Sequence, residues 1–248
     1  MIALLLPTAI LFVGAVVQGA MGFAFGLVCI SLLILTGIPL PSAMIAVGVA
    51  VLFQTLWLGW KYRTHAPGKE IALLIGVAYV GIVIGVCLLR VIAGIHPNLI
   101  KAIVGLVLVV ILLFQSFCHI QPRASIPKAW GWLAYGSGGF LCGLVGMGGP
   151  PVVLWVSAHD WPAVRMRVAL WISMCALVPV QGLMLYARFG WEMTSNGIKI
   201  GLIALPAVLV GTWLGARMGD RFSKKVLRKL IFALLWLIAG INLVAPFV

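Results

Sequence analysis

The chain has 248 residues, of which 64% are hydrophobic and only 8% are charged. Soluble domains carry about 25% charged residues, so this composition excludes a soluble fold. The formal net charge of +13 comes from 17 lysines and arginines set against 4 acidic residues. The basic residues lie in short gaps between apolar runs, not on one face with interleaved aromatic residues. This pattern indicates the cytoplasmic loops of a membrane protein and argues against a nucleic-acid partner.

Apolar runs long enough to cross a bilayer follow one another along the whole chain. A bilayer core takes about 20 apolar residues per helix. Short polar gaps separate the runs, and residues 118–129, which include Pro122 and Pro127, are expected to form a central linker. We therefore predict an all-α membrane protein. The runs cover residues 2–37, 42–60, 71–89, 99–117, 130–158, 168–187, 198–216 and 226–245.

The N-terminal run is apolar from its second residue and has no basic leader, so we expect no signal peptide. The five cysteines are odd in number, scattered in spacing and free of any CxxC pair. They therefore predict neither a disulfide framework nor a metal site. We expect no metal and no cofactor.

Glycine patterns indicate an internal repeat of four segments. Residues 14–26 read GAVVQGAMGFAFG and residues 138–150 read GGFLCGLVGMGGP. The predicted repeats are residues 1–117 and 130–248, which we expect to form one integrated membrane domain. With a constant offset, Gly14, Gly19 and Gly22 fall on Gly138, Gly143 and Gly146, and Gly81 and Gly85 later match Gly211 and Gly215 in order.

The first segment of each repeat is too long for a simple span. Residues 2–37 would extend about 50 Å as one helix, whereas the hydrocarbon core is about 30 Å thick. Each segment is either one tilted span or a broken hairpin that enters and leaves on the same side. Eight simple spans place 7 and 10 basic residues on the two sides, whereas two hairpins place 13 and 4. The hairpins obey the positive-inside rule better, invert the two repeats and put both termini outside the cytoplasm.

The segment from Gly143 to Pro151 is the strongest candidate for a functional site. Gly148 and Gly149 permit a tight turn, and proline is favoured in the first turn of a helix, so we expect a helix to restart at Pro150 or Pro151. A helix start offers free amide donors and partial positive charge, and hence an anion site without a cationic side chain. The alternative is that the glycines only allow close helix packing. We favour the site here and packing for the other glycine pairs. The site residues are Gly146, Met147, Gly148, Gly149 and Pro150.

The first repeat has a counterpart without the double proline. Gln18 and the backbone of Gly19 and Gly22 are expected to supply donors there, together with Phe23. Gln18 is equally compatible with a role as a hydrogen-bonding contact between helices.

The paired segments GAVVQGAMGFAFG and GFLCGLVGMGGPP, the four-segment halves and the length resemble the sulfite exporter TauE/SafE family of membrane permeases. The resemblance covers nearly the whole chain and rests on glycine patterns. It implies a permease for sulfur-containing anions, such as sulfite or organosulfonates, in the bacterial inner membrane. Phe25-Gly26 stand where the second half has Gly149-Pro150, which departs from two symmetric anion sites.

Three further polar residues are candidates for substrate binding. Arg165 is suited to an oxyanion, although it is also placed as a cytoplasmic flanking charge. Gln54 and Gln181 lie near mid-span in corresponding segments. Each of these glutamines either lines a cavity or bonds a neighbouring helix.

The function expected is secondary transport of a small anion. The four acidic residues, Glu70, Asp160, Glu192 and Asp220, lie at span ends or in loops, so no carboxylate relays protons at mid-span. No nucleotide-binding loop is present, and no acid–base pair indicates an enzyme. An anion channel is the alternative, and a membrane enzyme or partner subunit is a third. Beyond the anion and lipid, a homodimer is the one protein partnership that we consider.

Overall fold

The computed structural model describes residues 2–21, 24–61, 64, 68–95, 97–117, 123, 126–221 and 224–244. Within these ranges the chain is helical and has no β-strand; one isolated parallel bridge joins Arg123 to His159. The predicted all-α fold is therefore confirmed. The helices are α1 (Ile2–Met21), α2 (Phe25–Leu35), α3 (Leu40–Lys61), α4 (Gly68–Ile95), α5 (Pro97–Phe117), α6 (Lys128–Val145), α7 (Gly149–Ser157), α8 (Ala163–Arg221) and α9 (Lys224–Val244).

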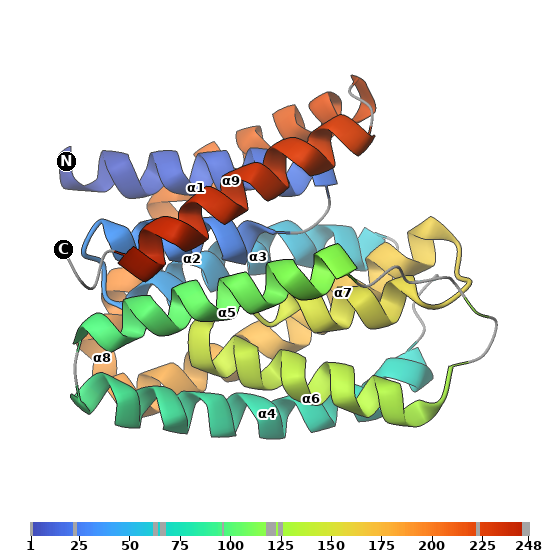
Figure 1. Ribbon diagram of the computed structural model, residues 1–248, viewed down its shortest axis with the longest axis horizontal. Coiled ribbons are helices and arrows are strands. Elements are labelled where there is room, and N and C mark those ends of the chain that lie inside the picture. Colours follow the sequence, from blue (N-terminus) through green and yellow to red (C-terminus); the bar gives the residue numbers. More distant parts are fainter. Residues whose placement is uncertain are drawn as a thin grey trace. The chain divides into compact units, whose positions relative to one another are not determined.

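The helices, which are labelled in Figure 1, fall into two compact units. Unit 1 comprises Met1–Ala50, Val91–Cys118 and Trp191–Val248, and unit 2 comprises Val51–Arg90 and His119–Gly190. Unit 1 thus contains α1, α2, α5, α9 and the second part of α8, whereas unit 2 contains most of α4 together with α6, α7 and the first part of α8. Each unit draws helices from both sides of the central linker.

Three helical stretches in the described ranges are long and apolar enough to cross a membrane, namely Ile71–Gly94, Leu99–Ser116 and Val164–Met218. Shorter apolar stretches lie in α1, α2, α3 and α9. Large apolar side chains cover the outer surface of α4 and α5, including Val80 and Leu106, which are 61% and 56% exposed. Such broad apolar surface is stable in contact with lipid and costly in water, which is the property of an integral membrane protein.

Both long first segments are interrupted, and in each the two pieces run antiparallel. In unit 1, Cys29 Sγ on α2 lies 3.7 Å from the Ile10 carbonyl on α1, and Gly14 of α1 packs against Phe25 of α2. A later residue of α1 therefore contacts an earlier residue of α2, which is the antiparallel arrangement. At 1.5 Å per residue, α2 and α7 extend only about 17 Å and 14 Å. Neither helix crosses a bilayer alone, as expected for one arm of a broken segment.

The open end of the α6–α7 hairpin is held together by the linker. Arg123 N donates to the Ala158 carbonyl at 2.9 Å, and Asp160 N donates to the Arg123 carbonyl at 3.2 Å. Residues just before α6 and just after α7 are therefore neighbours. Within unit 2, this hairpin enters and leaves at the same end.

The α8 helix departs from the sequence expectation. A polar gap was expected between residues 187 and 198, but the chain stays helical there except at Gly190, whose φ of 81° and ψ of −180° produce a kink. Polar residues alone do not end a helix; a backbone conformation outside the helical region does. The two predicted spans therefore become two longer helical stretches, 163–189 and 191–221, joined at one residue.

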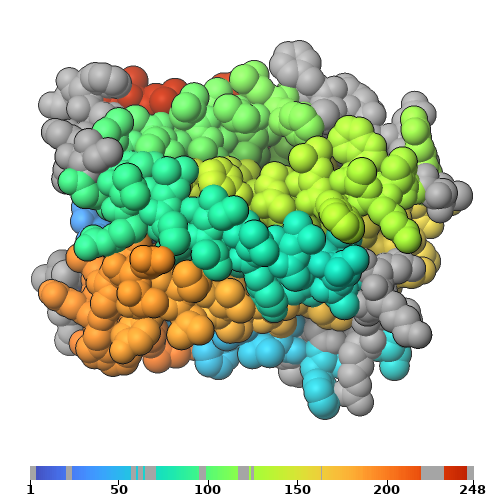
Figure 2. Space-filling view, turned by 90° about the horizontal axis from the view of Figure 1, so that it is seen from below, coloured from blue at the N-terminus to red at the C-terminus, as the bar shows by residue number. Residues whose placement is uncertain are grey.

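In unit 2, α4 and α6 pack side by side at glycines (Figures 1 and 2). A Cβ atom on Gly85 of α4 would touch the Phe140 carbonyl of α6 and would lie 2.7 Å from Leu144 N. A Cβ atom on Gly143 of α6 would touch the Ile82 carbonyl of α4. The two backbones therefore meet directly, as small residues permit between membrane helices.

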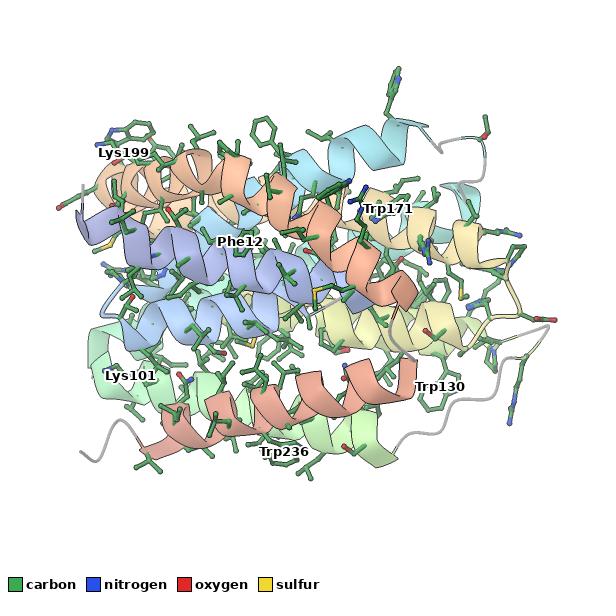
Figure 3. All side chains as sticks on the ribbon, turned by 90° about the horizontal axis from the view of Figure 1, so that it is seen from above. Phe12, Lys101, Trp130, Trp171, Lys199 and Trp236 are labelled. Atoms are coloured by element: carbon green, nitrogen blue, oxygen red, sulfur yellow. The ribbon has the colours of Figure 1, made fainter. Side chains whose placement is uncertain are left out.

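In unit 1, α1 and the second part of α8 make a similar contact. A Cβ atom on Gly215 of α8 would touch the Val16 carbonyl of α1 and would lie 3.0 Å from Ala20 N, and one on Gly19 would touch the Thr212 carbonyl. Along the same contact, Phe12 lies on α1 beside α8 (Figure 3). The packing role expected of Gly85 and Gly215 is thus what the structure shows, and Gly19, predicted as a site residue, also lies in such a contact.

Candidate functional site

The α6–α7 break is built by one residue in the left-handed region. Gly146 has a φ of 74°, its N–H donates to the Cys142 carbonyl at 3.0 Å, and Met147 N donates to the Leu141 carbonyl at 3.3 Å. These bonds end α6 in the way that a glycine cap usually does. The next helix then begins at Gly149, one residue before the predicted restart at Pro150 or Pro151.

The residues of the break differ sharply in the space around them. Gly148 is packed against α6, because a Cβ atom there would touch the Gly138 carbonyl and would lie 2.6 Å from Cys142 Cβ. By contrast, nothing described lies within 4 Å of a Cβ atom on Gly149. Met147 is 2% exposed and Pro150 is also buried. Within this break, Gly149 therefore adjoins open space, whereas Met147, Gly148 and Pro150 are packed.

The prolines reduce the number of donors at this helix start. The first three residues of a helix have no acceptor four residues earlier within the helix. In α7 these positions are Gly149, Pro150 and Pro151, and proline has no N–H. Only the Gly149 amide can therefore be offered to a ligand at these three positions. The α7 start therefore has fewer donors than a helix start without proline.

The corresponding break in the first hairpin has a different backbone. Two of the predicted site residues, Gly22 and Phe23, lie outside the described residues. Ala24 precedes α2 with a φ of 83°, which is uncommon for a residue with a side chain. The first three positions of α2 are Phe25, Gly26 and Leu27, and all three carry an N–H. This helix start therefore offers three donors where α7 offers one.

Gln18 and Gly19 lie on α1, just before that break. Gly19 lies in the close contact between α1 and α8, so packing alone explains why this position has no side chain. Gln18 is half-buried, and its Oε1 has no hydrogen-bond partner among the described residues. A buried acceptor of this kind does not itself favour an anion, because an anion needs donors. Only the Nε2 end of the side chain is suited to the predicted role.

Gln181 reaches the α6–α7 break from the first part of α8. It is 4% exposed, and its Nε2 donates to the Cys142 carbonyl at 2.7 Å. The same carbonyl accepts from Gly146, so Gln181 and the residue that caps α6 share one acceptor. Gln54 is also buried in unit 2, at 7% exposure, next to Thr55, whose hydroxyl contacts Cys175 Sγ at 3.2 Å.

Arg165 lies at the other end of α7 from the break. Its guanidinium carbon is 4.6 Å from the ring centroid of Trp161, which stacks on His159 at 4.3 Å. His159 in turn bonds the Trp155 carbonyl through Nδ1 at 2.9 Å. The structure therefore places Arg165 in an aromatic cluster at the open end of the hairpin, about 14 Å of helix from Gly149.

Sequence reasoning did not single out one buried polar pair of unit 2. Tyr135 is 0% exposed, and its hydroxyl lies 2.8 Å from Ser173 Oγ, which donates to the Ala169 carbonyl. The sequence feature that could have indicated this pair is the presence of a tyrosine and a serine inside apolar runs. Within the described residues, no group of three or more histidine, cysteine or acidic side chains is arranged to hold a metal ion.

Comparison with known proteins identifies the family. Residues 6–243 match the sulfite exporter TauE/SafE family. A protein of Cupriavidus necator named as a probable sulfite/organosulfonate exporter TauE is 23% identical over 240 residues, which cover 94% of this chain and 92% of that protein. No solved structure matches. With nearly its whole length matched, the chain belongs to the TauE/SafE family of sulfite exporters.

Proposed function

We propose that the protein is a secondary permease that moves sulfite or a small organosulfonate across the bacterial inner membrane. The family supplies the substrate class, and the observation that carries the site is a pair of helix starts within interrupted membrane segments. Irregular backbone survives at membrane depth only where protein buries it or a cavity solvates it. Such breaks are typical of transporter binding sites. The role assigned is transport and not catalysis.

In this proposal each helix start is a candidate anion site within its own unit, where backbone amides hold the anion. The α2 start offers the N–H groups of Phe25, Gly26 and Leu27, and the α7 start offers that of Gly149 beside open space. The positive end of each helix dipole adds to the attraction for an anion. Gln18 and Gln181 have supporting positions next to the two breaks, and Gln54 completes the proposed set. Arg165 is assigned to substrate entry and not to the central site.

We also propose that the fold consists of two inverted repeats, residues 1–117 and 130–248, joined by the linker 118–129. The two glycine contacts support this, because they use equivalent residues. Leu144 stands 124 positions after Ala20, as Phe140 does after Val16, and Gly215 stands 130 positions after Gly85. The α6 residues of one contact thus follow the α1 residues of the other by a constant 124 positions. A duplicated unit produces such a constant offset.

The arrangement of unit 1 supports the proposed orientation. The start of α1, the end of α9, Lys101 and Lys199 lie toward the same end of unit 1 (Figures 1 and 3). Lys101 and Lys199 are two of the four basic residues that the hairpin arrangement places on the less basic side, which the positive-inside rule puts outside the cytoplasm. Both termini are accordingly proposed to be extracytoplasmic. A homodimer remains compatible with this orientation.

Transport by purified protein in proteoliposomes tests the function. We expect saturable flux of sulfite or sulfoacetate with mutual competition, whereas a channel would give flux proportional to concentration. Taurine, which is a zwitterion, and sulfate serve as test solutes of different charge and size. The variant Gly149→Leu should fold and lose transport, with Gly149→Ala as the matched control. Absence of flux for every oxyanion would refute the function, and normal flux in Gly149→Leu would refute the α7 site.

A further inference from the structure

Two fully buried polar side chains in unit 1 have oxygen atoms that no described group satisfies. Ser31 lies on α2, Asn242 lies on α9, and both are 0% exposed. Ser31 Oγ and Asn242 Oδ1 have no hydrogen-bond partner among the described residues. Nearly all buried polar atoms in proteins have a partner, so an unpaired one calls for an explanation such as a bound water or ion.

The two side chains are neighbours, and their bonds fix which atom of the amide is unpaired. Asn242 Nδ2 donates to the Ile238 carbonyl at 2.9 Å and to the Ser31 carbonyl at 3.5 Å. Because both of these partners are acceptors, the nitrogen must face them and Oδ1 must point away. The unpaired atom is therefore an acceptor beside α2.

The Ser31 hydroxyl also differs from most other hydroxyls on these helices. In the usual arrangement, the hydroxyl donates to the carbonyl four residues earlier on its own helix. Ser31 makes no such bond to a described residue, so its oxygen is not committed to its own helix. The usual bond is made by Thr8, Thr55, Ser137, Ser173 and Thr212.

The surroundings of this pair are closed. Helices α2, α5 and α9 pack against one another. At the level of Asn242, a Cβ atom on Gly105 of α5 would lie 3.0 Å from Leu243 N and 3.2 Å from the Asn242 carbonyl carbon. The α5 backbone therefore closes over α9 at this point. A group that satisfies the two oxygens must be small.

We propose that Ser31 Oγ and Asn242 Oδ1 are ligands of a monovalent cation, with Na⁺ as the probe. Both oxygens can accept, so the bound group must be a cation or a donor, and uncharged oxygens are ligands that hard cations take. In its functional role the inference rests on the proposed anion transport. Ser31 is six residues into α2, about 9 Å from the helix start. At an effective dielectric constant of about 20, a cation at Ser31 and an anion at the α2 start would each increase the other's affinity on the order of tenfold.

Thermal unfolding of the full-length protein in detergent tests the site without any transport measurement. At equal ionic strength, Na⁺ should raise the Tm above that in choline by roughly 3–6 °C at a tenfold excess over its Kd. The variant Ser31→Ala should abolish the shift, and Asn242→Asp, which is isosteric and adds a negative charge, should enlarge it. Ser137→Ala, whose hydroxyl bonds only within its own helix, is the matched control and should keep the shift.

The outcomes separate this inference from the proposed function. Equal Tm values in Na⁺ and choline would overturn the cation site and leave a bridging water between the two oxygens. A Na⁺ shift that neither Ser31→Ala nor Asn242→Asp alters would also overturn it, because the cation would then bind elsewhere. Sulfite flux that is indifferent to Na⁺ would remove the coupling role while the permease function stands. If Na⁺ raises the Tm of a protein that moves no oxyanion, the cation site stands and the proposed transport function falls.

Discussion

The two interrupted hairpins follow the same order of glycines but solve the break differently. The second hairpin turns at Gly146 and packs Gly148 against α6. Proline occupies two of the first three positions of α7. The first hairpin turns at Ala24, packs its α1 glycine against side chains of α2, and keeps every N–H of its first turn. One break is therefore rigid and poor in donors, and the other is strained and rich in donors.

This difference suits the two helix starts to different roles, each within its own unit. Proline and close backbone contact reduce the freedom of the α7 start, so it is suited to hold a fixed shape. The α2 start has three amides in the first turn of a helix, where an anion is most strongly stabilised. Substitutions that exchange these properties between the hairpins test the comparison.

The largest effect is expected at Gly148. The variant Gly148→Ala places a Cβ atom against the Gly138 carbonyl and 2.6 Å from Cys142 Cβ, and overpacking against backbone should destabilise unit 2 by about 3 kcal/mol. Gly149→Ala enters open space and should leave stability within about 0.5 kcal/mol. Thermal unfolding and the yield of monodisperse protein measure the difference. Equal behaviour of the two alanines would show that the hairpin can separate at Gly148.

The next effect concerns the donors of α2. The variant Gly26→Pro copies Pro150 into the first hairpin and removes one N–H from the second helix position. Losing a hydrogen bond to a charged ligand costs about 1.5–3 kcal/mol, so the KM for sulfite should rise by at least about tenfold in proteoliposomes. Gly26→Ala keeps the amide and should transport normally. If both variants transport equally well, the α2 amides do not bind the anion.

A smaller and opposite pair of effects is expected from the backbone turns. A residue with a Cβ atom costs roughly 1–2 kcal/mol in the left-handed region relative to glycine. Ala24→Gly should therefore stabilise the protein by about 1 kcal/mol, and Gly146→Ala should destabilise it by a similar amount. Differential scanning calorimetry of the two variants measures both changes in Tm, an increase for Ala24→Gly and a decrease for Gly146→Ala. Changes of the same sign would contradict the assigned backbone conformations.

The smallest effect is expected for Gln181→Leu. The substitution removes the bond from Nε2 to the Cys142 carbonyl, but that carbonyl still accepts from Gly146. Hydrogen bonds between membrane helices contribute about 0.6 kcal/mol on average, so the Tm should fall by roughly 1–3 °C. A much larger fall in transport than in Tm would instead assign Gln181 to the substrate path.

The breaks themselves were predictable because their chemistry is local. A glycine in the left-handed region and a proline in the first turn are properties of single residues, so Gly146 and Pro150 indicate the break near where it is found. The interruption of α8 lies inside the polar gap expected between residues 187 and 198, but it is confined to one residue, because only Gly190 leaves the helical conformation.

The contacts between distant segments were not predictable in the same way. The acceptor for Gln181 lies 39 residues away on another helix, and its identity depends on how α6 and α8 pack. The small number of donors at α7 has a different cause. The prolines that indicate where the helix begins are the same residues that remove its amides, and the structure makes that cost clear.

The glycine contacts have a consequence for how the chain can be divided. Gly85 meets α6 and Gly215 meets α1, so each tight crossing joins a helix from before the linker to a helix from after it. A polypeptide cut within residues 118–129 would leave two fragments, each with a bare glycine surface shaped for the other. Neither fragment has its own partner for that surface, and assembly should require that both be made together in one membrane.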